Sequence, residues 1–293
     1  MRRILAVVFA TALETAGEAI TLLMTMSALA LAVLAPFLHF HQFGLPERMA
    51  IDAGLSAQLV FGLFIAIFAS IKALRREIES GTLQMALACA IPRTAFFCGK
   101  FIGIASILVF FSLILAFVTK TVAEGAIIGD AVARQIGDVP RLWGPSFTWG
   151  MTTLICPIVG SALLNYLFRF RFVLTANILI FLFALMGIFY AFDGALLGRV
   201  MAASSILLAP LLAFACAALA FSVQFADRLA AALSGLLLIP ALPAFGSYYL
   251  SQVILKGHPP SLAYGVMAWG AALPFMLFFI ILGCLLMKRR DVA

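Results

Sequence analysis

The sequence has little charge. Its 293 residues include 12 Asp and Glu and 19 Lys and Arg, so that 11% are charged, whereas 65% are hydrophobic and the mean hydropathy is +1.17. A soluble domain is normally about a quarter charged. This scarcity excludes a water-soluble protein, and the chain outside a bilayer would be too short for a separate catalytic domain. We therefore expect an integral membrane protein.

Cysteine and histidine are also scarce. The five cysteines contain no CxxC pair, which argues against a disulfide framework and a zinc site. His39 and His41 have no Cys, Asp or Glu nearby, so interfacial histidines are favoured over a metal site. The apolar segments also lack a His or carboxylate that could activate a nucleophile. We expect no metal and no catalytic residues.

Apolar stretches without Asp, Glu, Lys or Arg, of about the 20 residues that cross a bilayer, occur eight times. They predict an all-α, polytopic membrane helix bundle of about eight spans (six to eight) over residues 19–287. Within them, Gln58 and Asn177 favour hydrogen bonds between helices over a substrate route. The stretches are 19–38, 53–71, 101–119, 142–168, 172–192, 200–226, 229–255 and 257–287.

The net charge of +7 arises without a long basic run, which favours loops at a membrane surface over nucleic-acid binding. Positively charged loops stay in the cytoplasm. With both termini cytoplasmic, 13 Lys and Arg lie inside and six outside, the latter including Lys120 in a predicted outer loop over 120–141. The inner set is Arg2, Arg3, Lys72, Arg75, Arg76, Arg93, Lys100, Arg169, Arg171, Arg228, Lys288, Arg289 and Arg290.

The two ends of the chain differ from the apolar stretches. Residues 1–18 could be read as a signal peptide, but cleavage would reverse every later loop against the charge pattern. We instead expect an amphipathic helix at the cytoplasmic interface, with Glu14 and Glu18 on its polar side. Residues 288–293 are expected to form a basic cytoplasmic tail.

One predicted cytoplasmic segment, 72–100, is long enough to bind a partner. Charged residues follow the second predicted span and precede Gly81, which permits a sharp turn. A short apolar helix follows over 82–90, too short to cross the membrane and able to enter a partner's groove. Pro92 ends that helix.

This loop resembles the cytoplasmic loop of ABC transporter permeases of the type-2 exporter class, in which an E-x-E-x-G-T-L sequence precedes a coupling helix and a proline turn leads to Gly-Lys at the next span. The matching residues, in order, are Glu77, Glu79, Gly81, Thr82, Leu83, Pro92, Gly99 and Lys100. Arg93 directly follows the proline instead of lying two or three residues later. Such permeases commonly have six spans.

The resemblance implies a multi-pass subunit in the cytoplasmic (inner) membrane of a prokaryotic cell, paired with a second permease copy or a homologous permease. A separate ABC subunit would bind and hydrolyse ATP, because this chain has no GxxxxGKS or GxxxxGKT motif. Leu83, Met85 and Leu87 would contact that subunit. Arg75, Arg76 and the two glutamates, Glu77 and Glu79, would form a polar rim or pairs within the loop.

Other interpretations stay open. The loop could be an ordinary basic loop that dips into the interface. A secondary transporter or channel would need no nucleotide, but ion-driven carriers usually bury charged residues in the membrane, and the eight stretches contain no Asp, Glu, Lys or Arg. A structural or assembly protein is a third possibility. The sequence does not indicate the transported substrate.

Overall fold

A computed structural model describes residues 2–35, 46–79, 92–136, 145–168, 171–190, 194–225, 227–241, 250, 252–254, 256 and 258–289. These residues contain helices and no strand. The helices are α1 (Arg2–Ala16), α2 (Ala19–Leu34), α3 (Pro46–Glu79), α5 (Arg93–Ile136), α6 (Pro145–Phe168), α7 (Phe172–Tyr190), α8 (Gly194–Ser222), α9 (Asp227–Ala241) and α11 (Leu262–Arg289).

The prediction of an all-helical chain with apolar helices of membrane length is confirmed. Five helices are long and apolar enough to cross a bilayer, namely α3, α5, α6, α8 and α11, and a bent pair formed by α1 and α2 would make a sixth. Each of the eight predicted stretches overlaps at least one helix. The count of eight spans and the orientation of the termini stay predictions.

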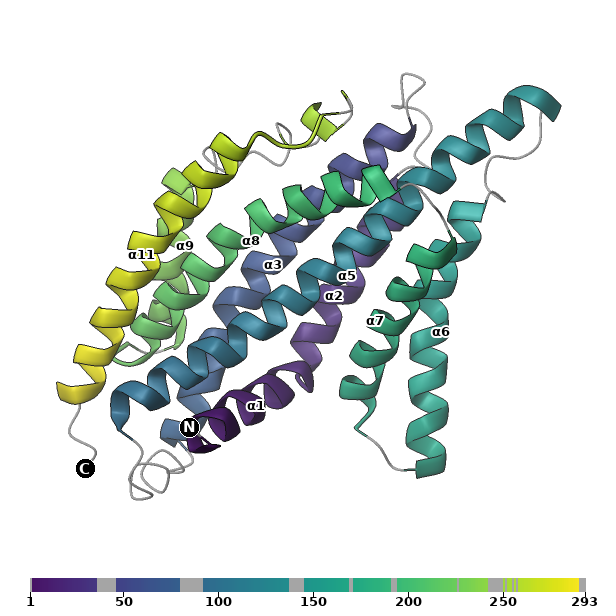
Figure 1. Ribbon diagram of the computed structural model, residues 1–293. Coiled ribbons are helices and arrows are strands. Elements are labelled where there is room, and N and C mark those ends of the chain that lie inside the picture. The colour runs from purple at the N-terminus through teal and green to yellow at the C-terminus, as the bar shows by residue number, and fades with distance from the viewer. Residues whose placement is uncertain are drawn as a thin grey trace.

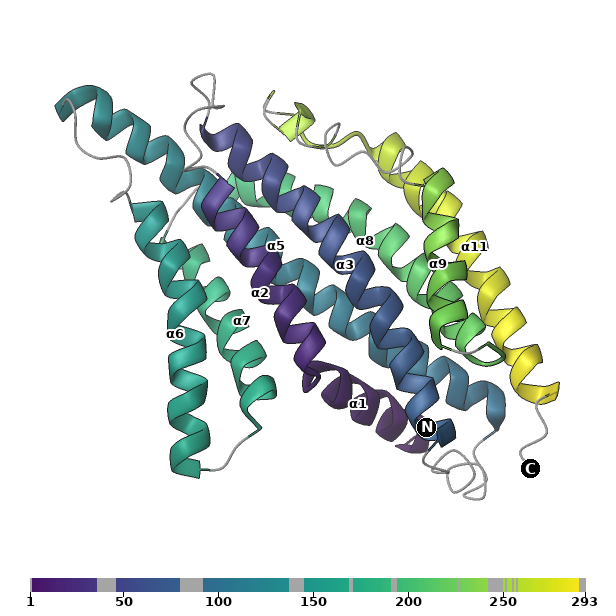
Figure 2. The ribbon, with the colours of Figure 1, turned by 180° about the vertical axis from the view of Figure 1, so that it is seen from behind.

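The centre of the bundle consists of α3, α5 and α8, which contact one another (Figures 1 and 2). The α9 and α11 helices lie on one side of this centre, and α2 with the α6–α7 hairpin lies on the other. The end of α3, the start of α5, α1 and the end of α11 share one end of the bundle. The segment 72–100 therefore leaves and re-enters the bundle beside α1 and the end of α11.

Buried polar side chains join the helices as the sequence predicts. Gln58 on α3 donates a hydrogen bond to the Ser204 carbonyl on α8 at 3.0 Å, and the Ser204 hydroxyl donates to the Ser112 carbonyl on α5 at 3.3 Å. Asn177 on α7 donates to the Ala16 carbonyl at the end of α1 at 2.8 Å. Buried polar groups need such partners because water cannot reach them.

One prediction, the loop over 120–141, is wrong. Residues 120–136 belong to α5 instead of an outer loop, because this helix continues to Ile136. Lys120 and Glu124 are buried on it, with side chains 2% and 7% exposed, and their charged groups lie 2.9 Å apart. Both lie beyond the predicted apolar stretch 101–119, which stays free of charge, although the longer candidate span Arg93–Ala126 includes them. A charged pair four residues apart interrupts an apolar run without ending a helix.

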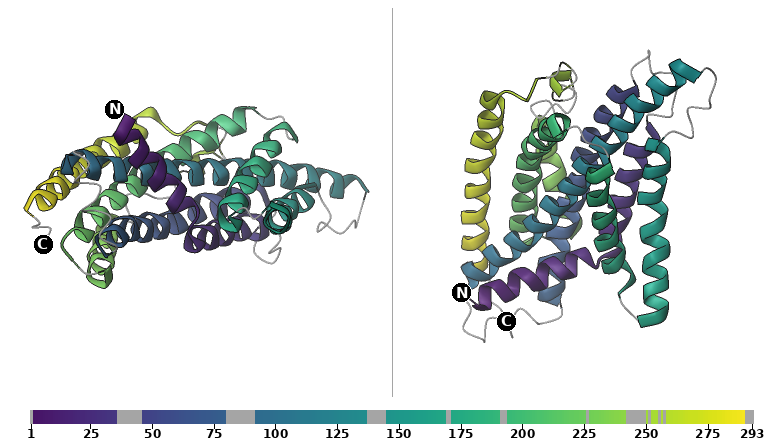
Figure 3. Two further views of the ribbon diagram at one scale, coloured as in Figure 1. Left: turned by 90° about the horizontal axis from the view of Figure 1, so that it is seen from below. Right: turned by 45° about the vertical axis from the view of Figure 1, so that its right-hand side comes forward.

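The α1 helix is separate from α2 and lies across one end of the bundle (Figure 3). The two axes differ by 61°, and the bend lies at Gly17 and Glu18. The α1 helix packs closely on α5 because Gly99 and Gly103 carry no side chain. A Cβ atom at Gly103 would lie 2.7 Å from the Thr11 Cβ and 2.9 Å from the Val8 carbonyl oxygen. This GxxxG is thus used for helix packing.

Replacing Gly103 by Ala should loosen α1. Alanine favours a helix by about 1 kcal/mol over glycine, but overpacking costs about 1–3 kcal/mol. We expect Gly103→Ala to lower the melting temperature in detergent. Gly270→Ala is the control, because nothing lies within 4 Å of a Cβ there, and it should keep or raise that temperature. Equal changes in both variants would contradict the packing of α1 on α5.

Candidate functional site

The predicted loop residues fall into two groups. Glu77 lies near the end of α3, Pro92 directly precedes α5, and Arg93 and Lys100 lie on α5. The side chain of Glu79 and all of Gly81, Thr82, Leu83, Met85 and Leu87 lie outside the described residues. The structure therefore describes the base of the loop, where its two ends enter the bundle.

A buried ion pair joins the two ends of the loop. The ammonium group of Lys100 lies 2.5 Å from a carboxylate oxygen of Glu77, and the two side chains are 2% and 22% exposed. The Lys100 ammonium also lies 5.8 Å from the centre of the Phe96 ring. A buried ammonium is stable only with such a partner, so this pair holds the end of α3 against the start of α5.

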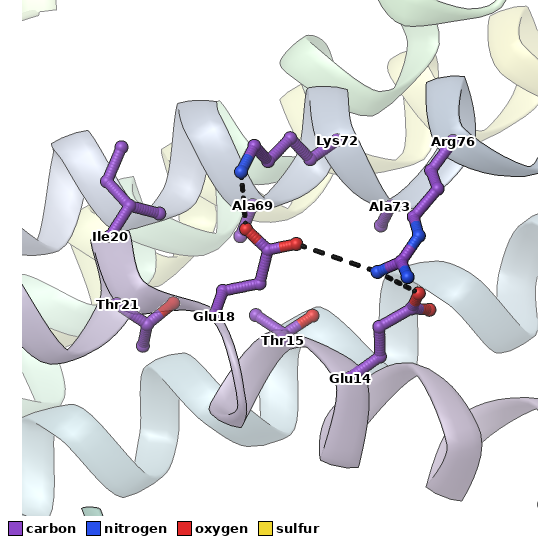
Figure 4. Close-up of a pocket in the computed structure, with 9 residues that line it drawn as sticks. All are labelled: Glu14, Thr15, Glu18, Ile20, Thr21, Ala69, Lys72, Ala73 and Arg76. Carbon is purple, nitrogen blue, oxygen red and sulfur yellow. Dashed lines mark hydrogen bonds and ion pairs between the residues drawn. The ribbon is translucent and has the colours of Figure 1, made fainter. Parts of the chain in front are cut away.

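A second set of ion pairs joins the end of α3 to α1 and to the bend that follows it (Figure 4). The Lys72 ammonium lies 2.6 Å from Glu18, and the Arg76 guanidinium lies 2.8 Å from Glu14 and 4.0 Å from Glu18. Arg76 thus pairs with the N-terminal helix in addition to any contact at the loop rim. We call Glu14, Glu18, Lys72, Arg76, Glu77 and Lys100 the loop-base cluster.

Sequence reasoning missed the partnership between these two helices. Lys72 and Arg76 lie four residues apart and project from one face of α3, whereas Glu14 lies in the last turn of α1 and Glu18, also four residues on, lies at the bend after it. Two acidic and two basic side chains with the same spacing are a complementary set. This matching spacing could have indicated the ion pairs from the sequence, although many other basic residues in the chain could equally have been chosen as partners of the two glutamates.

The start of α5 also holds the end of α11. The Arg93 guanidinium donates to the carbonyl oxygens of Met287 and Lys288, each at 3.2 Å. These carbonyls lie in the last turn of α11 and have no partner within the helix. One turn along, the Phe97 ring packs on Gly283, and the Cys98 and Cys284 thiols are neighbours.

The cluster contains no arrangement suited to bond-making chemistry. Its carboxylates are paired with cations, and no group of three His, Cys, Asp or Glu within the described ranges could hold a metal ion. What it provides is mechanical connection. Four chain segments, namely α1, the end of α3, the start of α5 and the end of α11, are joined by direct polar contacts at the base of one loop.

Comparisons of the chain with family models, curated proteins and solved structures found no match. The resemblance of segment 72–100 to a permease coupling loop therefore remains a hypothesis. Any function proposed for the chain depends on its own residues and their arrangement.

Removing one partner of the Lys100–Glu77 pair should destabilise the protein strongly. Lys100→Met leaves the Glu77 carboxylate without its ammonium, and we expect a loss of about 3 kcal/mol in the free energy of unfolding. Denaturant titration in mixed micelles measures it. The double variant Lys100→Met, Glu77→Leu should regain most of the loss, and the exposed-lysine variant Lys288→Met should lose little. A double variant as unstable as the single one would contradict the pairing.

The native cysteines test how α5 packs on α11. A short bifunctional methanethiosulfonate reagent should join Cys98 to Cys284, because their thiols are neighbours. Peptide mapping by mass spectrometry identifies the product. Cys156, which is exposed on α6, should react at one end only, and Cys98→Ala should abolish the cross-link. A cross-link from Cys284 to Cys156 in the monomer would contradict this arrangement.

Proposed function

We propose that the chain is the membrane-spanning permease subunit of an ATP-binding-cassette exporter. It would form the translocation path and couple it to ATP hydrolysis by a separate nucleotide-binding subunit, beside a second permease copy or a homologous permease. The observation that carries the proposal is the loop-base cluster. It ties both ends of segment 72–100 to each other and to α1, as a loop that receives force requires.

The two helices that flank the loop support this mechanism. The α3 helix has 34 residues and α5 has 44, and both pass through the centre of the bundle against α8. At about 1.5 Å per residue, α5 is about 66 Å long, roughly twice the thickness of the hydrocarbon core. A push on the loop would therefore reach the far end of the bundle through two continuous helices without an intervening joint.

Association with an ATPase tests the proposal. The tagged chain, purified from its own cells, should bring with it an ATP-binding-cassette subunit, and vesicles containing both should hydrolyse ATP. Leu83→Asp with Leu87→Asp should reduce both association and hydrolysis at least tenfold, because buried carboxylates would replace apolar contacts. Val292→Asp adds a charge to the predicted cytoplasmic tail and should change neither. Association that survives the double substitution would contradict the coupling role of this segment.

A secondary transporter is the second candidate, and one observation favours it. The buried Lys120–Glu124 pair lies within a candidate span, where ionisable residues usually have a role in ion or proton movement. Proton-gradient dissipation by vesicles holding this chain alone, without ATP, would support a carrier. In that case Glu124→Gln should abolish the proton flux, whereas Glu47→Gln, near the start of α3, should not. A flux that requires the ATPase subunit would support the exporter.

A further inference from the structure

An open groove of about 750 Å³ lies between the bend of α1 and α2 on one side and the start of α7 on the other. The α6–α7 hairpin diverges from α1 at this end of the bundle (Figure 1). Deeper along α7, the bond from Asn177 to Ala16 joins the two walls.

Charges of both signs line this groove. Glu14 lies in the last turn of α1, and Glu18 lies at the bend between α1 and α2. Arg76 lies on α3, and Arg171 directly precedes α7. The Glu14 side chain is 34% exposed and Arg76 is 66% exposed, so both remain accessible although they are paired. Arg171 is exposed, and among the described residues it has no ion-pair partner. One arginine is therefore free to bind an anion beside an accessible carboxylate.

The groove lies at the ends of two apolar stretches, where hydrocarbon is expected to give way to head groups. On α3 the apolar stretch 53–71 ends directly before Lys72, and on α7 the apolar stretch begins directly after Arg171. Leu13 and Phe172 supply apolar wall next to these charges. On α1, Leu5 and Phe9 continue the apolar surface at a spacing of four residues and are each 66% exposed.

We propose that this groove binds the head group of a zwitterionic phospholipid that carries a primary ammonium, such as phosphatidylethanolamine. Guanidinium groups bind phosphate through paired hydrogen bonds, so Arg171 and Arg76 hold the phosphate. The ammonium donates to Glu14, and the acyl chains lie along the apolar wall. An anionic head group lacks the cation for Glu14, and a choline group cannot donate a hydrogen bond. This site does not depend on the exporter function.

Native mass spectrometry of the full chain in detergent, after delipidation, tests the site. Dioleoyl phosphatidylethanolamine, phosphatidylcholine or phosphatidylglycerol is added at equal concentration, and the lipid-bound fraction is measured. The unaltered chain should retain phosphatidylethanolamine best. Arg171→Gln breaks no ion pair of the fold and should weaken its retention about tenfold, as expected for losing a charged hydrogen bond. Arg289→Gln, an exposed arginine at the same end of the bundle, should bind as the unaltered chain does.

Glu14→Gln tests the ammonium contact separately. It should remove the preference for phosphatidylethanolamine over phosphatidylcholine and leave phospholipid binding as such. This variant also weakens a pair with Arg76, so its melting temperature is compared with that of the unaltered chain, and Arg171→Gln decides the question if Glu14→Gln unfolds. Equal retention of the three lipids, preference for phosphatidylglycerol, or equal losses in Arg171→Gln and Arg289→Gln would overturn the proposal. A change in dimerisation in place of lipid retention would overturn it too.

Discussion

A charged group buried in a low-dielectric interior needs a partner of opposite charge, and this constraint organises the loop end of the bundle. Lys100 is almost fully buried, and Glu77, on the far side of the loop, satisfies it. The pair sets how α3 meets α5. Once these two helix ends are placed, Gly103 on α5 can receive α1, and Arg93 can bind the carbonyls that end α11. Several contacts thus follow from one buried ammonium.

The need of a buried charge for a partner also applies at a second position along α5. Lys120 pairs with Glu124, and it lies 20 residues beyond Lys100 on the same helix. At about 1.5 Å per residue this separation is about 30 Å, the thickness of a hydrocarbon core. The apolar stretch 101–119 lies between the two pairs. The charged pairs therefore agree with the boundaries expected from hydropathy, although Lys120 is packed inside the bundle and does not begin a loop.

Hydropathy predicts the helices well because burial in lipid requires long apolar runs, and each predicted stretch overlaps a helix. Charge predicts less. The sequence could not distinguish Lys120, which pairs within its own helix, from a cation that begins a loop. Nor could it choose Glu14 as the partner of Arg76, since the two are 62 residues apart and the choice depends on the bend after α1. The whole of the proposed coupling helix, including Leu83 and Leu87, lies outside the described residues, so its resemblance to a permease loop rests on sequence alone.

Arg76 belongs both to the loop-base cluster and to the wall of the groove. A displacement of the end of α3 changes the distance between Arg76 and Glu14, and it therefore changes the charges that the groove presents. Any ligand that binds those charges has a different affinity for each position of α3, and linkage makes the effect reciprocal. A molecule bound in the groove would thus shift the equilibrium between positions of the loop. The free energy of this shift equals the difference in the molecule's binding free energy between those positions. Because of the 61° bend, α1 contacts both the loop-base cluster and the groove, so a movement of this helix would couple the two.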